Sequence, residues 1–465
     1  MVQPIPLGEH IAPMTSGGED GALATATARV AGSLATTASP TAGAGASPAP
    51  TFGVGASPTP SFGTGASPTP SVAEAGYKAA RLAAALRAEL PVLPGWVVPV
   101  GEGRRAMRAG AEAIRAHGLA AGRVAVLAQT LDPALVDQLC AIVDALGGRV
   151  IVRSSSPLEG DGRWAGAFSS VTGVRREDVA AAVRSCWASA FAVDPLRRLK
   201  GCGLELEALE LAVLVQPEIV PEAGGVARTA DDAVTVEGIR GHPGALLSGW
   251  AEGARDGALA ELVGSRTVVD VAELAGRVYA DLGDDVIEWA GCGGKVWLLQ
   301  SLRSGASPGS EPAAPTPVAG TRVPGRPAVP GTAAGLLVAC QPHEPAAPDC
   351  RGAIVLVDRP VPGLAPLLFG ARGLISRAGA ASSHLAEVAR SLGVPMVIGC
   401  RPEAVTGPGP AAGAWFATIN GGTGEVVLTQ SRMSACQPPA RTASQVTSGG
   451  DRSLTGPRHF RSLVC

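Results

Sequence analysis

Three stretches with few large apolar side chains divide this 465-residue sequence and limit where it can bury a hydrophobic core. Residues 17–74 consist mainly of Ala, Ser, Thr, Pro and Gly, and Gly-Ala-Ser-Pro recurs at positions 45, 55 and 65. Repeat folds need bulky apolar residues in every unit, so this segment predicts a disordered insertion. Residues 304–332 have a similar composition and predict a flexible linker. The polar residues 431–465 predict a disordered tail.

The rest of the chain carries patterns of regular structure. Residues 1–16 predict an N-terminal strand segment. In residues 75–303 helical and strand patterns alternate, which predicts an α/β or α+β domain. The helical patterns cover residues 75–90, 105–117, 132–146, 177–192 and 268–282, and the strand patterns cover residues 149–156, 210–216 and 295–300. Residues 221–225 predict a turn.

Residues 333–430 predict a second, smaller β/α domain. Short apolar runs predict strands at residues 334–339, 353–357, 394–398, 416–419 and 424–428. They lie on both sides of an amphipathic stretch that predicts a helix. The sequence therefore predicts two folded domains joined by a linker.

Charge and cysteine usage exclude several classes of protein. The 38 basic and 40 acidic side chains give a formal net charge of −2, which provides no electrostatic basis for binding nucleic acid or an anionic membrane. The 9 cysteines occur singly, without a Cys-x-x-Cys pair, and we interpret them as reduced thiols. The N-terminus lacks the basic and apolar regions of a signal peptide, and no apolar run is long enough to cross a membrane, so we expect a cytoplasmic protein.

A histidine follows a Gly/Ala/Ser turn at the start of the amphipathic stretch. Ser382 or Ser383 is a suitable N-cap, which places His384 at the beginning of the predicted helix. Amides in the first turn of a helix have no partner within it and can bind an anion, such as a phosphoryl group carried on the imidazole. Considered alone, a single histidine is more often a structural or surface residue.

A phosphohistidine needs a phosphoryl donor, so we expect a nucleotide site in residues 75–303. Such a site needs basic side chains for the phosphates and oxygen ligands for Mg²⁺. Considered singly, each candidate is more simply interpreted as a solvated surface residue, and only their order and spacing favour a site. In chain order the candidates are Lys78, Arg153, Gln216, Glu288 and Gln300.

Residues 371–399 resemble the phosphohistidine segment of the PEP-utilising enzyme family, which includes phosphoenolpyruvate synthase, pyruvate phosphate dikinase and rifampin phosphotransferase. The family pattern is Gly-Gly-x-Thr-Ser-His-x-Ala-x-x-Ala-Arg-x-x-Gly-x-Pro-x-x-x-Gly. The positions that correspond here are Ser382, Ser383, His384, Ala386, Ala389, Arg390, Gly393, Pro395 and Gly399. The resemblance implies a swivelling domain in which His384 is catalytic and carries the phosphoryl group.

Residues 75–303 resemble the ATP-grasp nucleotide domain of the same family. The shared features are a Gly-x-Lys opening, a Val-Arg-Ser-Ser strand followed by an Ala-Gly loop, a Val-Gln strand and an Ile-Glu-Trp to Leu-Gln-Ser hairpin. The resemblance implies ATP and Mg²⁺ as cofactors. By position, Lys78 and Arg153 would clamp the ATP phosphates, Gly166 and Ser170 would be loop contacts, Gln216 would bind the nucleotide, and Glu288 and Gln300 would contact ATP and its Mg²⁺.

The sequence departs from the family pattern at three places. Leu302 stands where the family has Arg, Arg228 where it has Phe, and residues 238–241 lack the acidic residue of the corresponding loop. The resemblance also implies a barrel that binds phosphoenolpyruvate or pyruvate in the synthase and dikinase members. Such a barrel needs about 250 residues, far more than the predicted linker 304–332 or the predicted tail 431–465 provides. We therefore expect the acceptor to lie outside this chain, on another protein or as a small molecule.

Three functions are consistent with these residues. The resemblance implies an ATP-dependent, dikinase-like phosphotransferase that releases AMP and phosphate. The alternatives are a catalytically impaired relative that binds a nucleotide or a partner, and a phosphocarrier that another kinase labels on His384.

Overall fold

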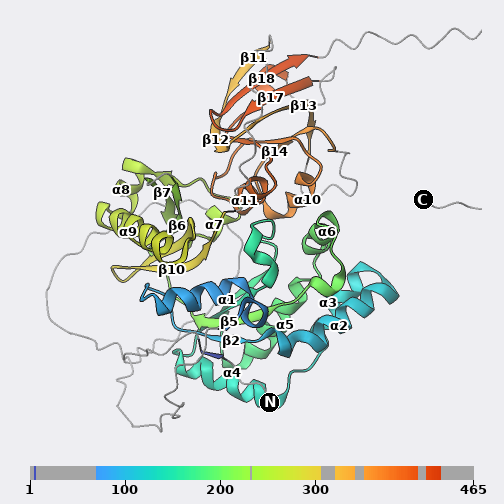
Figure 1. The fold of residues 1–465 in the computed structure, drawn as a ribbon, viewed down its shortest axis with the longest axis vertical. Helices are drawn as coiled ribbons and strands as arrows, with labels where there is room; N and C mark the ends of the chain where they lie inside the picture. The colour runs from blue at the N-terminus through green and yellow to red at the C-terminus, as the bar shows by residue number, and fades with distance from the viewer. Residues whose placement is uncertain are drawn as a thin grey trace, which may run out of the picture.

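The computed structural model describes residues 5–6, 70–230, 233–304, 320–340, 350–406 and 415–430. Most of the predicted insertion and the whole predicted tail lie outside these ranges. The last residues of the predicted insertion begin helix α1 (Val72–Arg87). Three sheets make up the described part of the chain, two in an N-terminal domain up to residue 304 and one in a C-terminal domain from residue 320 (Figure 1).

The first sheet has the strand order β1-β2-β5-β3-β4. Its strands are β1 (Ile5–Pro6), β2 (Trp96–Val98), β3 (Val150–Ser155), β4 (Ser170–Val174) and β5 (Ala212–Pro217). Its helices are α2 (Val100–His117), α3 (Leu119–Leu127), α4 (Pro133–Ala145), α5 (Val179–Ser189) and α6 (Val193–Gly201). Strand β5 is almost wholly buried because it lies at the centre of the sheet between β2 and β3.

The second sheet has the order β10-β9-β6-β7-β8 and is antiparallel throughout. Its strands are β6 (Ala223–Ala230), β7 (Ala233–Arg240), β8 (Ala254–Arg255), β9 (Val286–Cys292) and β10 (Lys295–Leu302). Its helices are α7 (Gly244–Leu247), α8 (Asp256–Val263) and α9 (Ser265–Leu282). One hydrophobic core joins α1, α9 and both N-terminal sheets, so α1 fixes the position of one sheet relative to the other.

The third sheet has eight strands in the order β11-β18-β17-β13-β14-β15-β16-β12. They are β11 (Thr321–Pro324), β12 (Arg326–Val329), β13 (Thr332–Ala339), β14 (Ile354–Val357), β15 (Gly373–Ser376), β16 (Met396–Ile398), β17 (Trp415–Asn420) and β18 (Glu425–Gln430). Its helices are α10 (Ala365–Leu368), α11 (His384–Ser391) and α12 (Glu403–Thr406). Helices α10 and α11 face the N-terminal domain, and α10 packs against α6 (Figure 1).

Two sequence-based predictions need correction. Within the predicted linker 304–332, residues 321–329 form β11 and β12, the two edge strands of the third sheet. Their prolines are tolerated because an edge strand leaves one row of backbone donors unpaired. The turn predicted at residues 221–225 is also too long, since β6 already begins at Ala223.

The long periodic segments were predicted correctly. Helices α1, α2, α4, α5 and α9 lie where helical periodicity placed them, and β3, β5 and β10 lie where strand patterns did. In the N-terminal domain, the sequence pattern did not predict β4, β6, β7, β8, α3, α6, α7 or α8. No helix in the described ranges is sufficiently long and apolar to span a membrane.

Candidate active site

A cavity of about 340 Å³ lies between the two N-terminal sheets and is bordered on one side by the C-terminal domain. All the site residues predicted from the sequence line it: Lys78, Arg153, Gly166, Ser170, Gln216, Glu288, Gln300 and His384. The first sheet supplies Arg153, Ser170 and Gln216, the second supplies Glu288 and Gln300, and α11 supplies His384. Residues more than 300 positions apart in sequence thus meet in one cavity.

Lys78 reaches the cavity because α1 is interrupted at Gly76. This glycine has φ 72° and ψ 168°, a conformation open almost only to glycine. A Cβ at Gly76 would lie 2.1 Å from the carbonyl oxygen of Ser155, so the glycine also permits close approach of α1 to β3.

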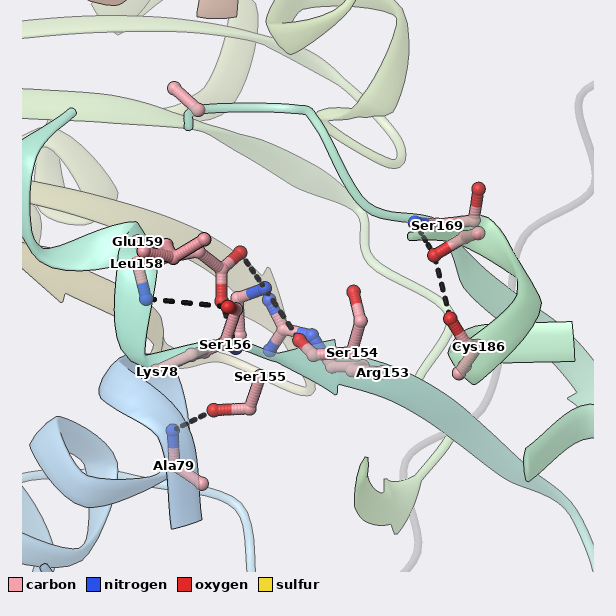
Figure 2. A network of polar contacts seen from close by, with 12 residues as sticks. Lys78, Ala79, Arg153, Ser154, Ser155, Ser156, Leu158, Glu159, Ser169 and Cys186 are labelled. Carbon is pink, nitrogen blue, oxygen red and sulfur yellow. Dashed lines mark hydrogen bonds and ion pairs between the residues drawn. The ribbon is translucent and has the colours of Figure 1, made fainter. Parts of the chain in front are cut away.

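Two acceptors then hold the buried ammonium group of Lys78 (Figure 2). Lys78 Nζ donates to the carbonyl oxygen of Ser154 at 2.9 Å and pairs with Glu159 Oε1 at 3.1 Å. These two contacts hold the positively charged ammonium group of Lys78 in place at the cavity wall.

Arg153 and Gln216 lie on neighbouring strands and are linked by hydrogen bonds. Arg153 Nη1 donates to the carbonyl oxygen of Leu299 at 2.7 Å and to Gln216 Oε1 at 3.4 Å. The side-chain nitrogen Nε2 of Gln216 donates to the backbone carbonyl oxygen of Leu93 at 2.9 Å, which fixes the orientation of this buried amide. Burial lowers the pKa of Arg153, although Glu288 and Glu159 oppose the shift. A guanidinium stays protonated at neutral pH, so Arg153 brings a second positive charge to the cavity.

Glu288 and Gln300 face each other across β9 and β10 and supply oxygen atoms to the cavity. Carboxylate and amide oxygens are ligands that Mg²⁺ accepts, and this ion commonly binds one or two carboxylates together with substrate phosphates and water. The described part of the chain holds no cluster of three or more His, Cys, Asp or Glu side chains suited to a metal. The oxygen atoms of Glu288 and Gln300 are of the type that fits a Mg²⁺ ion bound together with the phosphates of a nucleotide.

The imidazole of His384 lies directly against Gly166. A Cβ at Gly166 would be 2.7 Å from Cδ2 of His384, and the glycine has φ 65°, which side chains rarely adopt. Ser383 is the N-cap of α11, and its Oγ accepts from the backbone N–H of Ala386 at 3.3 Å. The predicted position of His384 at a helix start is therefore confirmed.

The environment of His384 favours a neutral imidazole. Burial lowers the pKa of His384, Lys78 adds to this shift, and Glu288 opposes it. A lowered pKa keeps the ring nitrogens available as acceptors or nucleophiles below the usual titration range of histidine.

We therefore expect His384 to titrate below pH 6.5, the ordinary value for histidine. The folded protein binds a proton there less readily than the unfolded chain, so stability from this group is present above the unfolded pKa and falls as the pH decreases below it. A ¹³C-labelled histidine NMR titration, assigned with a His384→Asn variant, measures the midpoint. A midpoint at or above pH 6.5 would contradict the lowered pKa of His384.

Several charged residues at or beside the cavity were not among the predicted site residues. Glu159 pairs with Lys78, and Glu387 pairs with Arg228 of β6. Arg198 of α6 is fully buried and donates to the carbonyl oxygens of Arg163 and Ala165, just before Gly166. The position of Glu387 beside His384 could have been predicted from the sequence, because it follows His384 by three residues on the same helix.

Two of the departures from the family pattern line the cavity. Leu302 is buried in a small apolar cluster with Val226, Leu247 and Val286. Arg228 donates to Glu387, so it connects the second sheet to α11. Relative to the family pattern, Leu302 therefore removes a cation from the cavity, and Arg228 adds one.

Family models match both domains of the chain. The model described as pyruvate phosphate dikinase, AMP/ATP-binding domain, matches residues 72–245, and the model described as PEP-utilising enzyme, mobile domain, matches residues 350–424. The chain belongs to the PEP-utilising enzyme family. Its two N-terminal sheets are the ATP-grasp-like part of the family architecture, and its third sheet is the swivelling part, as the resemblance implied.

Two curated archaeal proteins are similar to this chain, and both are named probable phosphoenolpyruvate synthase. A probable phosphoenolpyruvate synthase of Methanothermobacter thermautotrophicus is 26% identical over 318 residues, which are 58% of this chain and 46% of that protein. A probable phosphoenolpyruvate synthase of Archaeoglobus fulgidus is 25% identical over 302 residues, 54% of this chain and 40% of that protein. The chain thus spans less than half of the length of these relatives.

Among solved structures, the D-alanyl-alanine synthetase A of Vibrio cholerae is 13% identical, with 49% of this chain and 55% of that chain covered. The TM-score is 0.28, which is too low to bear on the fold.

Proposed function

We propose that this chain is an ATP-dependent phosphotransferase module in which His384 receives a phosphoryl group from ATP. One observation supports this most strongly: the imidazole lies against Gly166 in the cavity that also holds the predicted phosphate and Mg²⁺ ligands. Donor and nucleophile need to be held close together for such a transfer, because orientation supplies much of the rate.

The residues of the cavity have different roles in this reaction. Lys78 and Arg153 bind the phosphates and stabilise the charge that develops during transfer. Glu288 and Gln300 would hold Mg²⁺, which would neutralise phosphate charge. Neutral His384 attacks the β-phosphorus of ATP through Nε2, which breaks the bond to the α-phosphate, releases AMP and leaves a diphosphate on the imidazole. Water then cleaves the terminal phosphoryl group as inorganic phosphate, and one phosphoryl group stays on His384.

We further propose that the phosphoryl group leaves with the C-terminal domain. On this proposal residues 75–303 are the nucleotide-binding domain and residues 333–430, extended by β11 and β12, are the phosphohistidine domain. Separation of the two domains would bring His384 to an acceptor held on another protein or as a small molecule. His384 would then carry the phosphoryl group from the nucleotide cavity to that acceptor.

Detection of phosphohistidine tests the proposal directly. We expect ATP and Mg²⁺ to produce an acid-labile phosphate on the peptide that contains His384, together with AMP, and we expect none in a His384→Ala variant. Mass spectrometry of peptides kept at alkaline pH measures the label. Labelling at equal level in the variant would exclude His384 as the carrier.

Leu302 favours a second candidate, a relative that binds a nucleotide without turning it over. This side chain places an apolar surface in the cavity where the family pattern has a cation. ATP binding without AMP release would support that candidate. A label on His384 that appears only after another kinase is added would indicate a phosphocarrier.

A further inference from the structure

A buried ion pair crosses the interface between the two domains. Arg228 of β6 donates through Nη2 to Oε2 of Glu387 on α11. Glu387 also accepts from Arg390 Nη1 at 2.9 Å, and its side chain is only 5% exposed. Arg390 in turn donates to the backbone carbonyl of Ala328 at 2.9 Å. One carboxylate thus lies between two guanidinium groups, each from a different domain.

The charge of Glu387 is compensated fully only when the domains are docked. Its second oxygen, Oε1, is buried without a hydrogen-bond partner, so this carboxylate depends strongly on its two cations. Burial alone would raise the pKa of Glu387, but Arg228 and Arg390 outweigh burial and hold that pKa below its ordinary value. Arg390 moves with Glu387 on α11, whereas Arg228 stays with the N-terminal domain.

We propose that Arg228 and Glu387 are positioning residues that seat His384 in the cavity. Without Arg228, the docked arrangement would keep Glu387 buried beside a single cation, while separation of the domains would return the carboxylate to water. Loss of one partner from a buried pair is strongly unfavourable for that reason. The inference rests on the proposed function for its purpose, since docking brings His384 to the donor, but docking itself needs no ATP.

A second ion pair crosses the same interface and provides a matched control. Arg326 of β12 pairs with Glu252, which follows α7, at 3.0 Å. Both side chains are 50% exposed, so water screens the attraction and the pair contributes little to docking. The two pairs therefore differ in burial but share the charges and the interface.

The reactivity of His384 toward diethyl pyrocarbonate measures docking in the full chain without nucleotide. Contact with Gly166 limits access to the imidazole in the docked state, and exposed His117 on α2 serves as an internal reference in the same sample. We expect Arg228→Met to raise the reaction rate of His384 at least tenfold and Arg326→Met to change it less than twofold. Arg228→Lys, which keeps the charge, is expected to give an intermediate rate.

The ratio of the rates in the two Met variants decides the proposal. A His384 rate at least threefold higher in Arg228→Met than in Arg326→Met supports it, and a smaller ratio overturns it. If Arg228→Met does not fold, as judged by circular dichroism, Glu387→Gln and Glu252→Gln take the place of the two variants with the same threshold.

A second readout separates this inference from the proposed function. If ATP labels His384, Arg228→Met should lower the labelling rate at saturating ATP, where occupancy of the nucleotide site no longer limits that rate. If ATP never labels the native chain but the reactivity pattern holds, the proposed function fails and the docking role stands. If ATP labels the native chain but Arg228→Met leaves the reactivity of His384 unchanged, the docking role fails and the proposed function stands.

Discussion

Replacing Gly166 with alanine is expected to reduce the labelling of His384 by ATP about a hundredfold. The new Cβ would lie 2.7 Å from Cδ2 and 2.9 Å from Cβ of His384, so rotation of the ring alone cannot relieve the clash. The imidazole must move away from the cavity wall by a substantial fraction of an ångström. A misplacement of about 1 Å can lower a rate about 10²-fold, because transfer depends on close alignment. Rapid-quench measurement of phosphohistidine formation gives the rate.

Gly203 provides a control with the same backbone cost. Its φ is 66°, against 65° for Gly166, but no heavy atom lies within 4 Å of the position of its Cβ. Gly203→Ala therefore introduces a similar strain without the contact, and we expect its labelling rate to stay within about twofold of the native rate. Equal rates in the two variants would show that the docked arrangement is not the one in which His384 reacts.

Replacing Gly76 with alanine is expected to lower the free energy of unfolding of the N-terminal domain by about 4 kcal/mol. Its φ of 72° and ψ of 168° cost an alanine about 2 kcal/mol. The added Cβ would lie 2.1 Å from the carbonyl oxygen of Ser155, in a strand paired on both sides, and forced overpacking of this kind costs about 2 kcal/mol more. Urea unfolding followed by tryptophan fluorescence measures the change.

Gly118 allows the two contributions to be separated. Its φ of 88° and ψ of 174° are close to those of Gly76, but the space around its Cβ position is empty within 4 Å. Gly118→Ala should therefore lose only the strain energy, about 2 kcal/mol. If both variants lose the same stability, then the close approach of α1 to β3 is not required for the fold.

The candidate site was more predictable than the fold around it. His384 and its N-cap could be predicted because a helix start is signalled by neighbouring residues, and Lys78, Arg153 and Glu288 could be predicted because each belongs to a short motif whose order resembles a known family. Edge strands β11 and β12 were missed because their composition resembles that of a linker. What makes them strands is pairing with β18 and β16, which are distant in sequence.

The sequence by itself determined which chemical groups are present and where each local element begins: a histidine at the first turn of a helix, and a lysine, an arginine and carboxylate and amide oxygens in the order of a nucleotide site. Only the tertiary structure decided that these groups share one cavity, that Gly166 leaves room for the imidazole, and that Arg228 pairs with Glu387 at a separation of 159 residues. The physical reason is the distance along the chain over which each effect acts. Capping and periodicity depend on neighbours along the chain, whereas burial, charge compensation and close approach depend on which surfaces the packed domains bring together.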